Sequence, residues 1–210
     1  MNTPSPESLL DARDVRASLG GDGEAYARIV RRHQPWLARR MLRFSRDRLV
    51  VEELVQETFV EAYFSLKNYR FEAPLPHYLQ CIATRTGYRH WKSRKQTRER
   101  AAALQNLAPD GGPAPLDAPD PGAEAARILD HVMEGLPPRD RLVITLLHLE
   151  EHSVAETAQL AGWSEVMVKV QAFRARRKLR QLLEDRGITA AALFGDPASK
   201  PPSGDRHERD

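Results

Sequence analysis

The chain has 210 residues, 41% of them hydrophobic, which is enough apolar material for one or two small domains. Its 32 basic and 29 acidic residues leave a net charge of only +3, so a strongly basic surface requires segregated charges. The single Cys81 excludes an internal disulfide framework and a multi-cysteine zinc site, and no apolar run approaches the length of a membrane span. The first residues, MNTPSPESLLDARD, lack the basic-then-apolar order of a secretion signal, so we expect a cytoplasmic protein without membrane insertion.

The first helix is predicted from residue 23 onward, and the preceding residues 1–22 are weakly specified, so we expect a flexible N-terminus. Apolar residues recur at the helical period through GEAYARIVRRHQPWLARRMLRFS, and Asp47 then provides a cap for the next helix. The predicted apolar face of this helix contains Tyr26, Ile29, Val30, Trp36, Leu37, Met41 and Leu42.

A second helix is predicted over DRLVVEELVQETFVEAYFSLKNY. Its apolar side consists of Val51, Leu54, Val55, Phe59, Ala62, Tyr63 and Leu66. Its other side is acidic, because the segment from Asp47 to Leu66 holds five acidic residues and one basic residue. Such a face suits a partner with a basic surface and is a poor choice for contacting DNA.

A third helix, LPHYLQCIATRTGYRHWKSRKQTRER, becomes strongly cationic. Seven basic residues and one acidic residue lie between Arg85 and Arg100, interleaved with Tyr88 and Trp91. Cations together with aromatic rings suit a phosphate backbone beside unstacked bases. The alternative interpretation is that both rings belong to the core. Gly87 is an unusual choice inside a helix, where glycine costs about 1 kcal/mol relative to alanine.

The chain then changes composition. Residues 101–126 contain no Lys or Arg, and PDGGPAPLDAPDP holds five prolines and three aspartates, which disfavours helix and sheet. No run of alternating apolar residues predicts a strand. We therefore expect an all-α protein with two small helical domains, residues 23–100 and 124–187. A flexible linker over 101–123 joins them, and residues 188–210 form a disordered tail.

The second domain ends in a helix-turn-helix pattern. Ser153 and Glu156 form a capping box, Gly162 permits the positive φ that ends a helix, and Ser164 caps a second helix. The inward stripe of that second helix is Val168, Ala172, Ala175 and Leu179. Its other face is basic, which is typical of a helix that enters the major groove of duplex DNA.

The helical period leaves Met167, Val170, Gln171, Arg174 and Lys178 facing outward. Glutamine can bind adenine bidentately and arginine can bind guanine, so Gln171 and Arg174 are the predicted base readers. We expect Lys169, Arg176 and Arg177 to contact phosphates.

Three segments together carry a resemblance to a known family: VEELVQETFVEAYFSL, LPHYLQCIATRT and, after the linker, LPPRDRLVITLLHLEEHSVAETAQLAGWSEVMVKVQAFRARRKLRQLL. Their order resembles bacterial sigma factors of the extracytoplasmic-function (ECF) group. The resemblance implies a subunit that binds core RNA polymerase, directs it to promoter DNA and assists melting. The chain departs from the family at Val166 and Met167, where Gly-Thr is frequent, and at Gln171, where Arg is common.

The resemblance also implies where each partner binds. It assigns the polymerase contact to Glu53, Gln56 and Glu57. It assigns −10 recognition to the loop residues Asn68, Tyr69, Arg70 and Phe71, which could receive a flipped base, and to Arg85, Arg89 and Lys92. The −35 contact falls on Ser164, Met167, Lys169, Gln171, Arg174, Arg176, Arg177 and Lys178. The family implies no catalytic residue, cofactor or metal, and the sequence leaves open whether an anti-sigma protein binds.

Three competing interpretations remain. A stand-alone helix-turn-helix regulator would explain Ser153 to Leu179 but not the acidic helix, the cationic helix or the linker. The sequence HLEEH, His148 to His152, matches a zinc-protease signature that needs one continuous helix, yet Ser153 caps a new helix directly afterwards. Cys81 lies between Leu79 and Ile82, which favours a small buried apolar residue over a reactive thiol.

Overall fold

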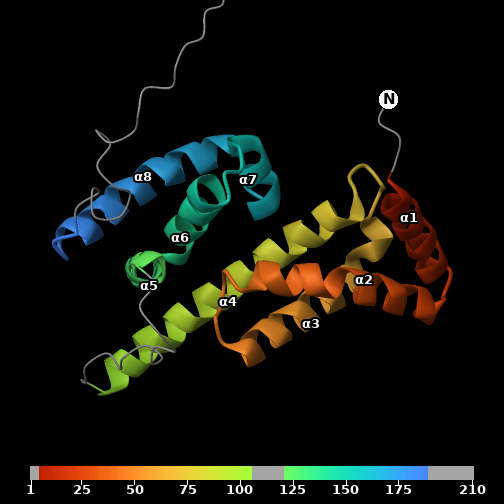
Figure 1. The fold of residues 1–210 in the computed structure, drawn as a ribbon, viewed down its shortest axis with the longest axis horizontal. Coiled ribbons are helices and arrows are strands. Elements are labelled where there is room, and N and C mark those ends of the chain that lie inside the picture. Colours follow the sequence, from red (N-terminus) through yellow and green to blue (C-terminus); the bar gives the residue numbers. More distant parts are fainter. Residues whose placement is uncertain (1–4, 106–120, 189–210) are drawn as a thin grey trace, which may run out of the picture.

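The computed structural model describes residues 5–105 and 121–188, and every regular element in these two ranges is helical, as predicted (Figure 1). A 3₁₀ turn, Leu66–Asn68, follows α3, and a π-helical turn, Thr145–Leu149, follows α6. The helices are α1 (Pro6–Leu19), α2 (Gly23–Met41), α3 (Arg48–Ser65), α4 (Leu75–Gln105), α5 (Pro121–Glu134), α6 (Pro138–Ile144), α7 (Val154–Ala161) and α8 (Glu165–Glu184).

The helical bounds differ from the predicted linker at both ends. Helix α4 continues to Gln105 and α5 begins at Pro121, so both helices enter the stretch 101–123. The rest of the predicted linker and the tail beyond residue 188 lie outside the described residues.

The N-terminal unit is built from α1 to α4 around one core. Asp22 and Asp47 accept backbone hydrogen bonds at the starts of α2 and α3, as the capping pattern of Asp47 predicts. The predicted apolar faces of both helices are inside, except that Leu42 and Tyr63 are exposed at their edges. The buried set includes Ile29, Leu37, Met41, Val51, Leu54, Val55, Phe59, Ala62 and Leu66.

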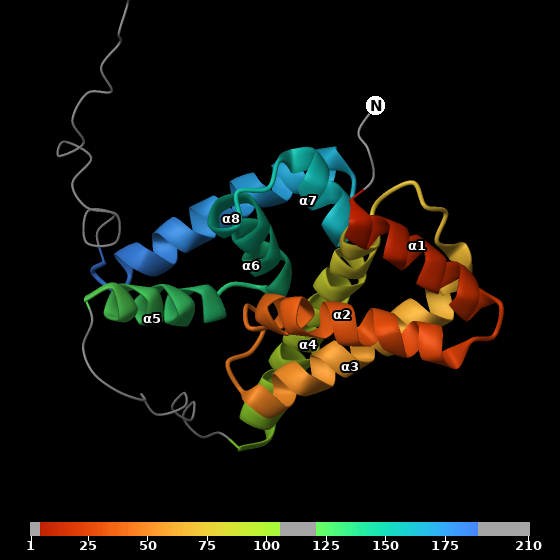
Figure 2. The same ribbon diagram turned by 45° about the vertical axis from the view of Figure 1, so that its right-hand side comes forward.

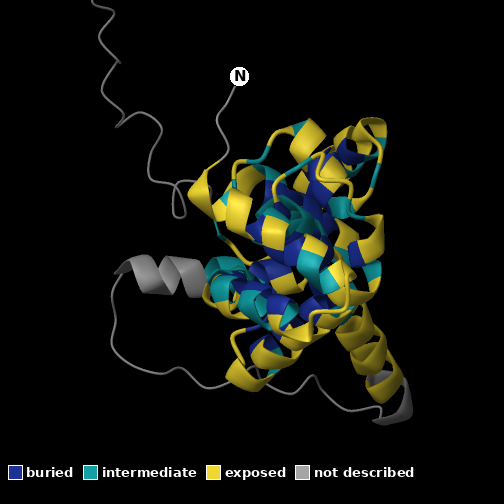
Figure 3. Ribbon diagram, turned by 90° about the vertical axis from the view of Figure 1, so that its right-hand side faces the viewer, coloured by how far each residue is buried: buried dark blue, intermediate teal, exposed yellow. Residues whose placement is uncertain are grey.

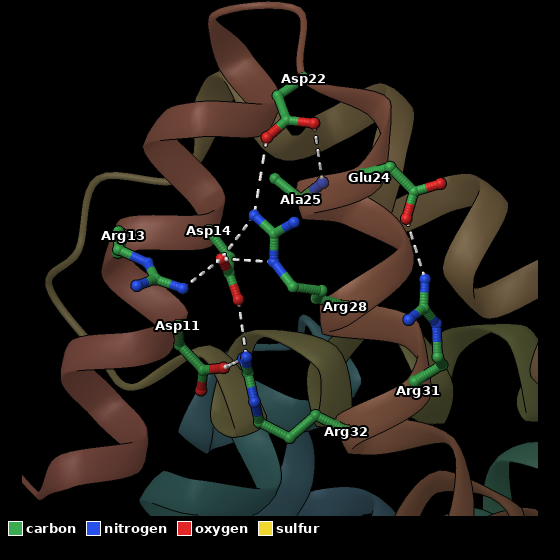
Figure 4. A network of polar contacts seen from close by, with 9 residues as sticks. All are labelled: Asp11, Arg13, Asp14, Asp22, Glu24, Ala25, Arg28, Arg31 and Arg32. Atoms are coloured by element: carbon green, nitrogen blue, oxygen red, sulfur yellow. Dashed lines mark hydrogen bonds and ion pairs between the residues drawn. The ribbon is translucent and has the colours of Figure 1, made fainter.

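Helix α1 corrects the expectation of a flexible stretch before residue 23. Ser5 caps it, and two of its carboxylates are buried against α2 (Figure 4). The guanidinium of Arg32 donates to Asp14 at 2.6 Å, Arg28 donates to the same carboxylate at 3.1 Å, and Arg32 also contacts Asp11. Sequence periodicity missed α1 because it docks mainly through ion pairs, while several of its leucines stay exposed.

Gly87 and Trp91 lie where α4 crosses the loop after α2. A Cβ on Gly87 would stand 2.3 Å from the ring of Phe44, so only glycine allows this approach. The Trp91 ring packs on Phe44, with centroids 4.7 Å apart, and its Nε1 donates to the Phe44 carbonyl oxygen at 2.9 Å. The close crossing of the loop therefore explains the unusual glycine.

The C-terminal unit, α5 to α8, rests on α4 through α6 and α7 (Figure 2). Glu150, after the π-helical turn, forms ion pairs with Arg40 and Arg43 at the end of α2, and Arg46 pairs with Asp130 of α5. Beyond these contacts, residues 92–101 of α4 are all exposed and project from the body (Figure 3). The two units thus meet along the first half of α4 and at the end of α2 with the loop that follows it.

Candidate nucleic-acid and protein interfaces

The helix-turn-helix has the predicted caps. The backbone N–H of Ser153 donates to Glu156 Oε2 at 2.8 Å, and the N–H of Glu156 donates to Ser153 Oγ at 3.2 Å. Gly162 has φ 71°, and the N–H of Met167 donates to Ser164 Oγ at 3.2 Å. The capping box, the turn and the second cap are therefore confirmed.

Helix α8 is anchored by its predicted inward stripe. Val168, Ala172 and Ala175 are buried. Leu179 packs against the apolar cluster of Met133, Leu136, Ile144 and Ala175. Helix α6 separates α8 from α4, so the opposite side of α8 faces outward (Figures 1 and 2). The exposed residues on α8 and its cap include Ser164, Lys169, Arg174, Arg176 and Arg177, while Met167 is half-buried.

Two of the residues predicted to face DNA are instead held by a buried carboxylate. Asp140, in the first turn of α6, is fully buried. Gln171 Nε2 donates to its Oδ1, and Lys178 Nζ donates to its Oδ2 at 2.7 Å. The expectation that Gln171 points outward is wrong, because that flank of α8 lies against α6. Helical periodicity gives no information about a contact with a residue 31 positions away in sequence.

The acidic face of α3 is exposed as predicted. Glu53, Gln56 and Glu57 all lie on its solvent side. Sequence reasoning missed the exposed apolar residues beside them: Val60 is 55% exposed and Phe64 is 71% exposed. Their spacing from Glu53 follows the same helical period and could have revealed them.

Residues predicted for two different partners also contact each other. Arg89 of α4 donates to Glu57 Oε1 at 3.0 Å and to Glu61 Oε2 at 2.5 Å. The hydrogen bond to Glu61 raises the pKa of Arg89. Arg89 therefore joins the acidic face of α3 to the cationic face of α4.

The loop after α3 and helix α1 line an open pocket of about 290 Å³. Tyr69 donates its hydroxyl to the carbonyl oxygen of Ala73 at 2.6 Å, and its ring lies 4.8 Å from that of Phe71. Arg16 of α1 covers Phe71, with Cζ 5.0 Å from the ring centroid. Asn68 and Arg70 are exposed at the loop surface. In this loop the rings of Tyr69 and Phe71 are thus held by neighbouring groups, whereas the side chains of Asn68 and Arg70 are exposed to solvent.

The cationic helix α4 presents fewer aromatic rings to solvent than predicted. Arg85 and Lys92 are exposed, but Trp91 is buried and Tyr88 is half-buried, edge-on to Trp163 with ring centroids 6.1 Å apart. The alternative interpretation, that these rings belong to the core, holds for Trp91. Arg85 lies beside the turn of the helix-turn-helix: a Cβ on Gly162 would stand 3.3 Å from its Nε.

The two alternative chemical sites do not form in the arrangement they require. The chain leaves the helix at Leu149, and Glu151 has φ 56°, so His148 and His152 do not share one helix. His152 Nε2 lies 3.2 Å from Glu150 Oε2 instead. Burial raises the pKa of the Cys81 thiol, which disfavours the reactive thiolate. In residues 5–105 and 121–188, no three His, Cys, Asp or Glu side chains gather as a metal site would need.

Together, an acidic helix, a cationic helix and a capped helix-turn-helix define a helical DNA-binding transcription protein. Two family profiles match the chain: Sigma-70 region 2 over residues 29–97 and Sigma-70 region 4 over residues 126–179. The ECF RNA polymerase sigma factor SigF of Caulobacter vibrioides is 32% identical over 181 residues, covering 83% of this chain and 94% of that protein. The chain belongs to the ECF sigma factors, and it directs core RNA polymerase to promoter DNA.

Other relatives agree. The RNA polymerase sigma-E factor of Streptomyces avermitilis is 28% identical over 173 residues, covering 82% of this chain and 93% of that protein. CnrH, solved in complex with the cytosolic domain of CnrY, is 26% identical with a TM-score of 0.52, covering 85% of this chain and 97% of that one. RpoE of Bartonella quintana, solved with the anti-sigma factor NepR, shares the fold at 19% identity and a TM-score of 0.50, covering 76% and 96%.

None of the helices in residues 5–105 and 121–188 combines the length and apolar character that spanning a membrane requires.

Proposed function

We propose that this sigma factor divides its work among three surfaces: α3 for core polymerase, the loop after α3 with α4 for the −10 element, and α8 for the −35 element. The observation that carries this proposal is the segregation of charge in a chain of nearly balanced composition. Acidic residues line the exposed side of α3, while basic residues line α4 and α8.

The polymerase surface combines charge with apolar area. Glu53 and Gln56 supply polar groups, and Val60 and Phe64 supply exposed apolar side chains on the same side of α3. Protein interfaces have an apolar centre within a polar rim, and a cluster of this kind suits that arrangement. Complementary charge would then orient a basic partner surface.

The −10 surface is proposed to hold an unstacked base in the pocket between α1 and the loop. Tyr69 and Phe71 line this pocket, and a base that displaces Arg16 from Phe71 would stack on their rings. Asn68 and Arg70 are exposed on the same loop. Arg85, Arg89 and Lys92 would then hold the strand along α4.

The two DNA surfaces would need to separate before both bind. Arg85 and Tyr88 lie against Gly162 and Trp163, so the turn of the helix-turn-helix covers part of α4. Binding of core polymerase would supply the free energy for this opening. The contacts that it must break include the ion pairs of Glu150 with Arg40 and Arg43, the Arg46–Asp130 pair and the packing of Arg141 on Trp91.

We propose further that the protein acts by binding alone, with no catalytic residue, cofactor or metal of its own, and that it works in the cytoplasm. A protein partner of the anti-sigma class also belongs to this proposal, since CnrH was solved with a bound protein domain. The competing function, a regulator that binds DNA without polymerase, gives no role to the acidic and apolar residues of α3.

Competition for core polymerase tests the proposed surface. Glu53→Lys and Phe64→Ala should each weaken binding to core, because one reverses a charge and the other removes apolar contact area. Glu7→Lys and Leu10→Ala, at exposed positions on α1, are the matched controls and should bind normally. Full competition by both α3 variants would contradict the assignment.

A further inference from the structure

Three large apolar side chains form an exposed stripe on the first half of α8. Val166 is 71% exposed, Val170 is 46% exposed and Phe173 is 66% exposed. They are spaced four and three residues apart, so they follow one side of the helix. Single exposed apolar residues are ordinary, but a stripe of three on the helix that a helix-turn-helix presents to DNA is not.

Cations border this stripe. Lys169, Arg174 and Arg177 are exposed next to it in sequence and on the same outward half of α8. Lys169 and Arg177 are expected to contact phosphates, which leaves the apolar stripe and Arg174 to face the edges of the bases.

One of the two predicted base readers, Gln171, is withdrawn, whereas Arg174 stays exposed. Asp140 holds Gln171 and Lys178 against α6. Asp140 is fully buried, and a buried carboxylate that loses its hydrogen-bond donors is strongly destabilised. Gln171 therefore stays with Asp140, and base contacts must come from other side chains of α8.

We propose that Val166, Val170 and Phe173 determine part of the −35 specificity by contacting thymine methyl groups. The C5-methyl of thymine is the apolar group that the major groove displays, so it is the matching partner for an apolar stripe. This inference rests on the proposed −35 role of α8 and names the base that the stripe recognises.

The test removes the methyl group alone. Holoenzyme made from the full chain and core polymerase first selects −35 sequences from a promoter library. Each thymine in the selected element is then replaced by deoxyuridine, and promoter binding is measured. At one or more positions the wild type should lose affinity roughly fourfold, the factor that burying one methyl-sized group supplies.

Variants assign the effect to the stripe. The triple variant Val166→Ala, Val170→Ala, Phe173→Ala should bind thymine and deoxyuridine templates equally, whereas Gln181→Ala, at an exposed position near the end of α8, should keep the wild-type difference. Equal binding of both templates by the wild type, or an unchanged difference in the triple variant, would overturn the inference.

A separate variant tests the underlying role of α8. Arg177→Ala should weaken binding evenly across −35 sequences. If the library yields no −35 preference and Arg177→Ala has no effect, the proposed −35 role fails and this inference fails with it. A clear −35 preference without methyl sensitivity overturns the inference alone.

Discussion

The guanidinium of Arg141 lies over the indole of Trp91, with its Cζ 4.1 Å from the ring centroid. Arg141 belongs to α6 and Trp91 to α4, so this contact joins the two helical units. Arg141 is half-buried, and this burial lowers the pKa of its guanidinium. Trp91 is therefore part of the interface that holds the units together.

Replacing Trp91 with alanine should destabilise the fold. The ring is buried against Phe44, so Trp91→Ala should lower the free energy of unfolding by about 3–5 kcal/mol in urea denaturation. Phe173→Ala, at an exposed aromatic residue of α8, is the control and should leave it nearly unchanged. Equal stability of the two variants would show that Trp91 is not a core residue.

Gly87→Ala should also destabilise the protein, although alanine has the higher helix propensity. Propensity alone favours alanine by about 1 kcal/mol inside a helix. However, the new Cβ would stand 2.3 Å from the buried Phe44 ring, and overpacking of this kind costs about 1–3 kcal/mol. Gly23→Ala, whose Cβ would meet open space, should be neutral or stabilising. A thermal melt in which both variants gain stability would contradict the crossing geometry.

Because Asp14 is buried and paired with two arginines, the free energy of unfolding should depend on pH in the acid range. Burial alone would raise the pKa of Asp14, but hydrogen bonds from Arg32 and Arg28 outweigh it, so the pKa lies below its ordinary value. The stabilisation is thus present above about pH 4 and is lost as the pH falls through the lowered pKa of the folded state. Asp14→Asn should lose about 2–3 kcal/mol near neutral pH and show a flatter acid limb.

Denaturation over a pH series measures this effect. Glu24→Gln, which breaks an exposed ion pair with Arg31, serves as the control and should change stability by less than about 1 kcal/mol. An acid limb of the same slope in Asp14→Asn and in the wild type would exclude Asp14 as its source.

Asn68 should matter for opening promoters. It is exposed just before the loop that follows α3, so Asn68→Ala should leave the fold intact and remove a group that can hydrogen-bond an unstacked base. Transcription from duplex promoters should fall more than transcription from pre-opened ones, because only the duplex requires base capture during melting. Equal loss on both templates would count against the role of the loop in melting.

Local chemistry predicted much of this fold. The caps at Asp47, Ser153 and Ser164 and the turn at Gly162 depend on neighbouring residues only, so they could be read from the sequence. The docking of α1 could not, because its ion pairs with Arg28 and Arg32 join separate helices.

The candidate sites show the same limit. The exposed positions of Glu53 and Arg174 follow from helical period alone. The capture of Gln171 by Asp140 and the pairing of Arg89 with Glu57 depend on contacts between distant segments. Helical periodicity therefore identified the exposed faces of these helices. It could not show which side chains on those faces are held by contacts with other helices.

In vitro transcription with purified core polymerase on fragmented genomic DNA tests the central claim most directly. A sigma factor should form a complex with core and produce defined start sites, each preceded by shared −35 and −10 sequences. Core polymerase without the protein should give no such sites. Sequence-specific DNA binding by the protein alone, without core binding or defined initiation, would contradict the account and support a stand-alone regulator.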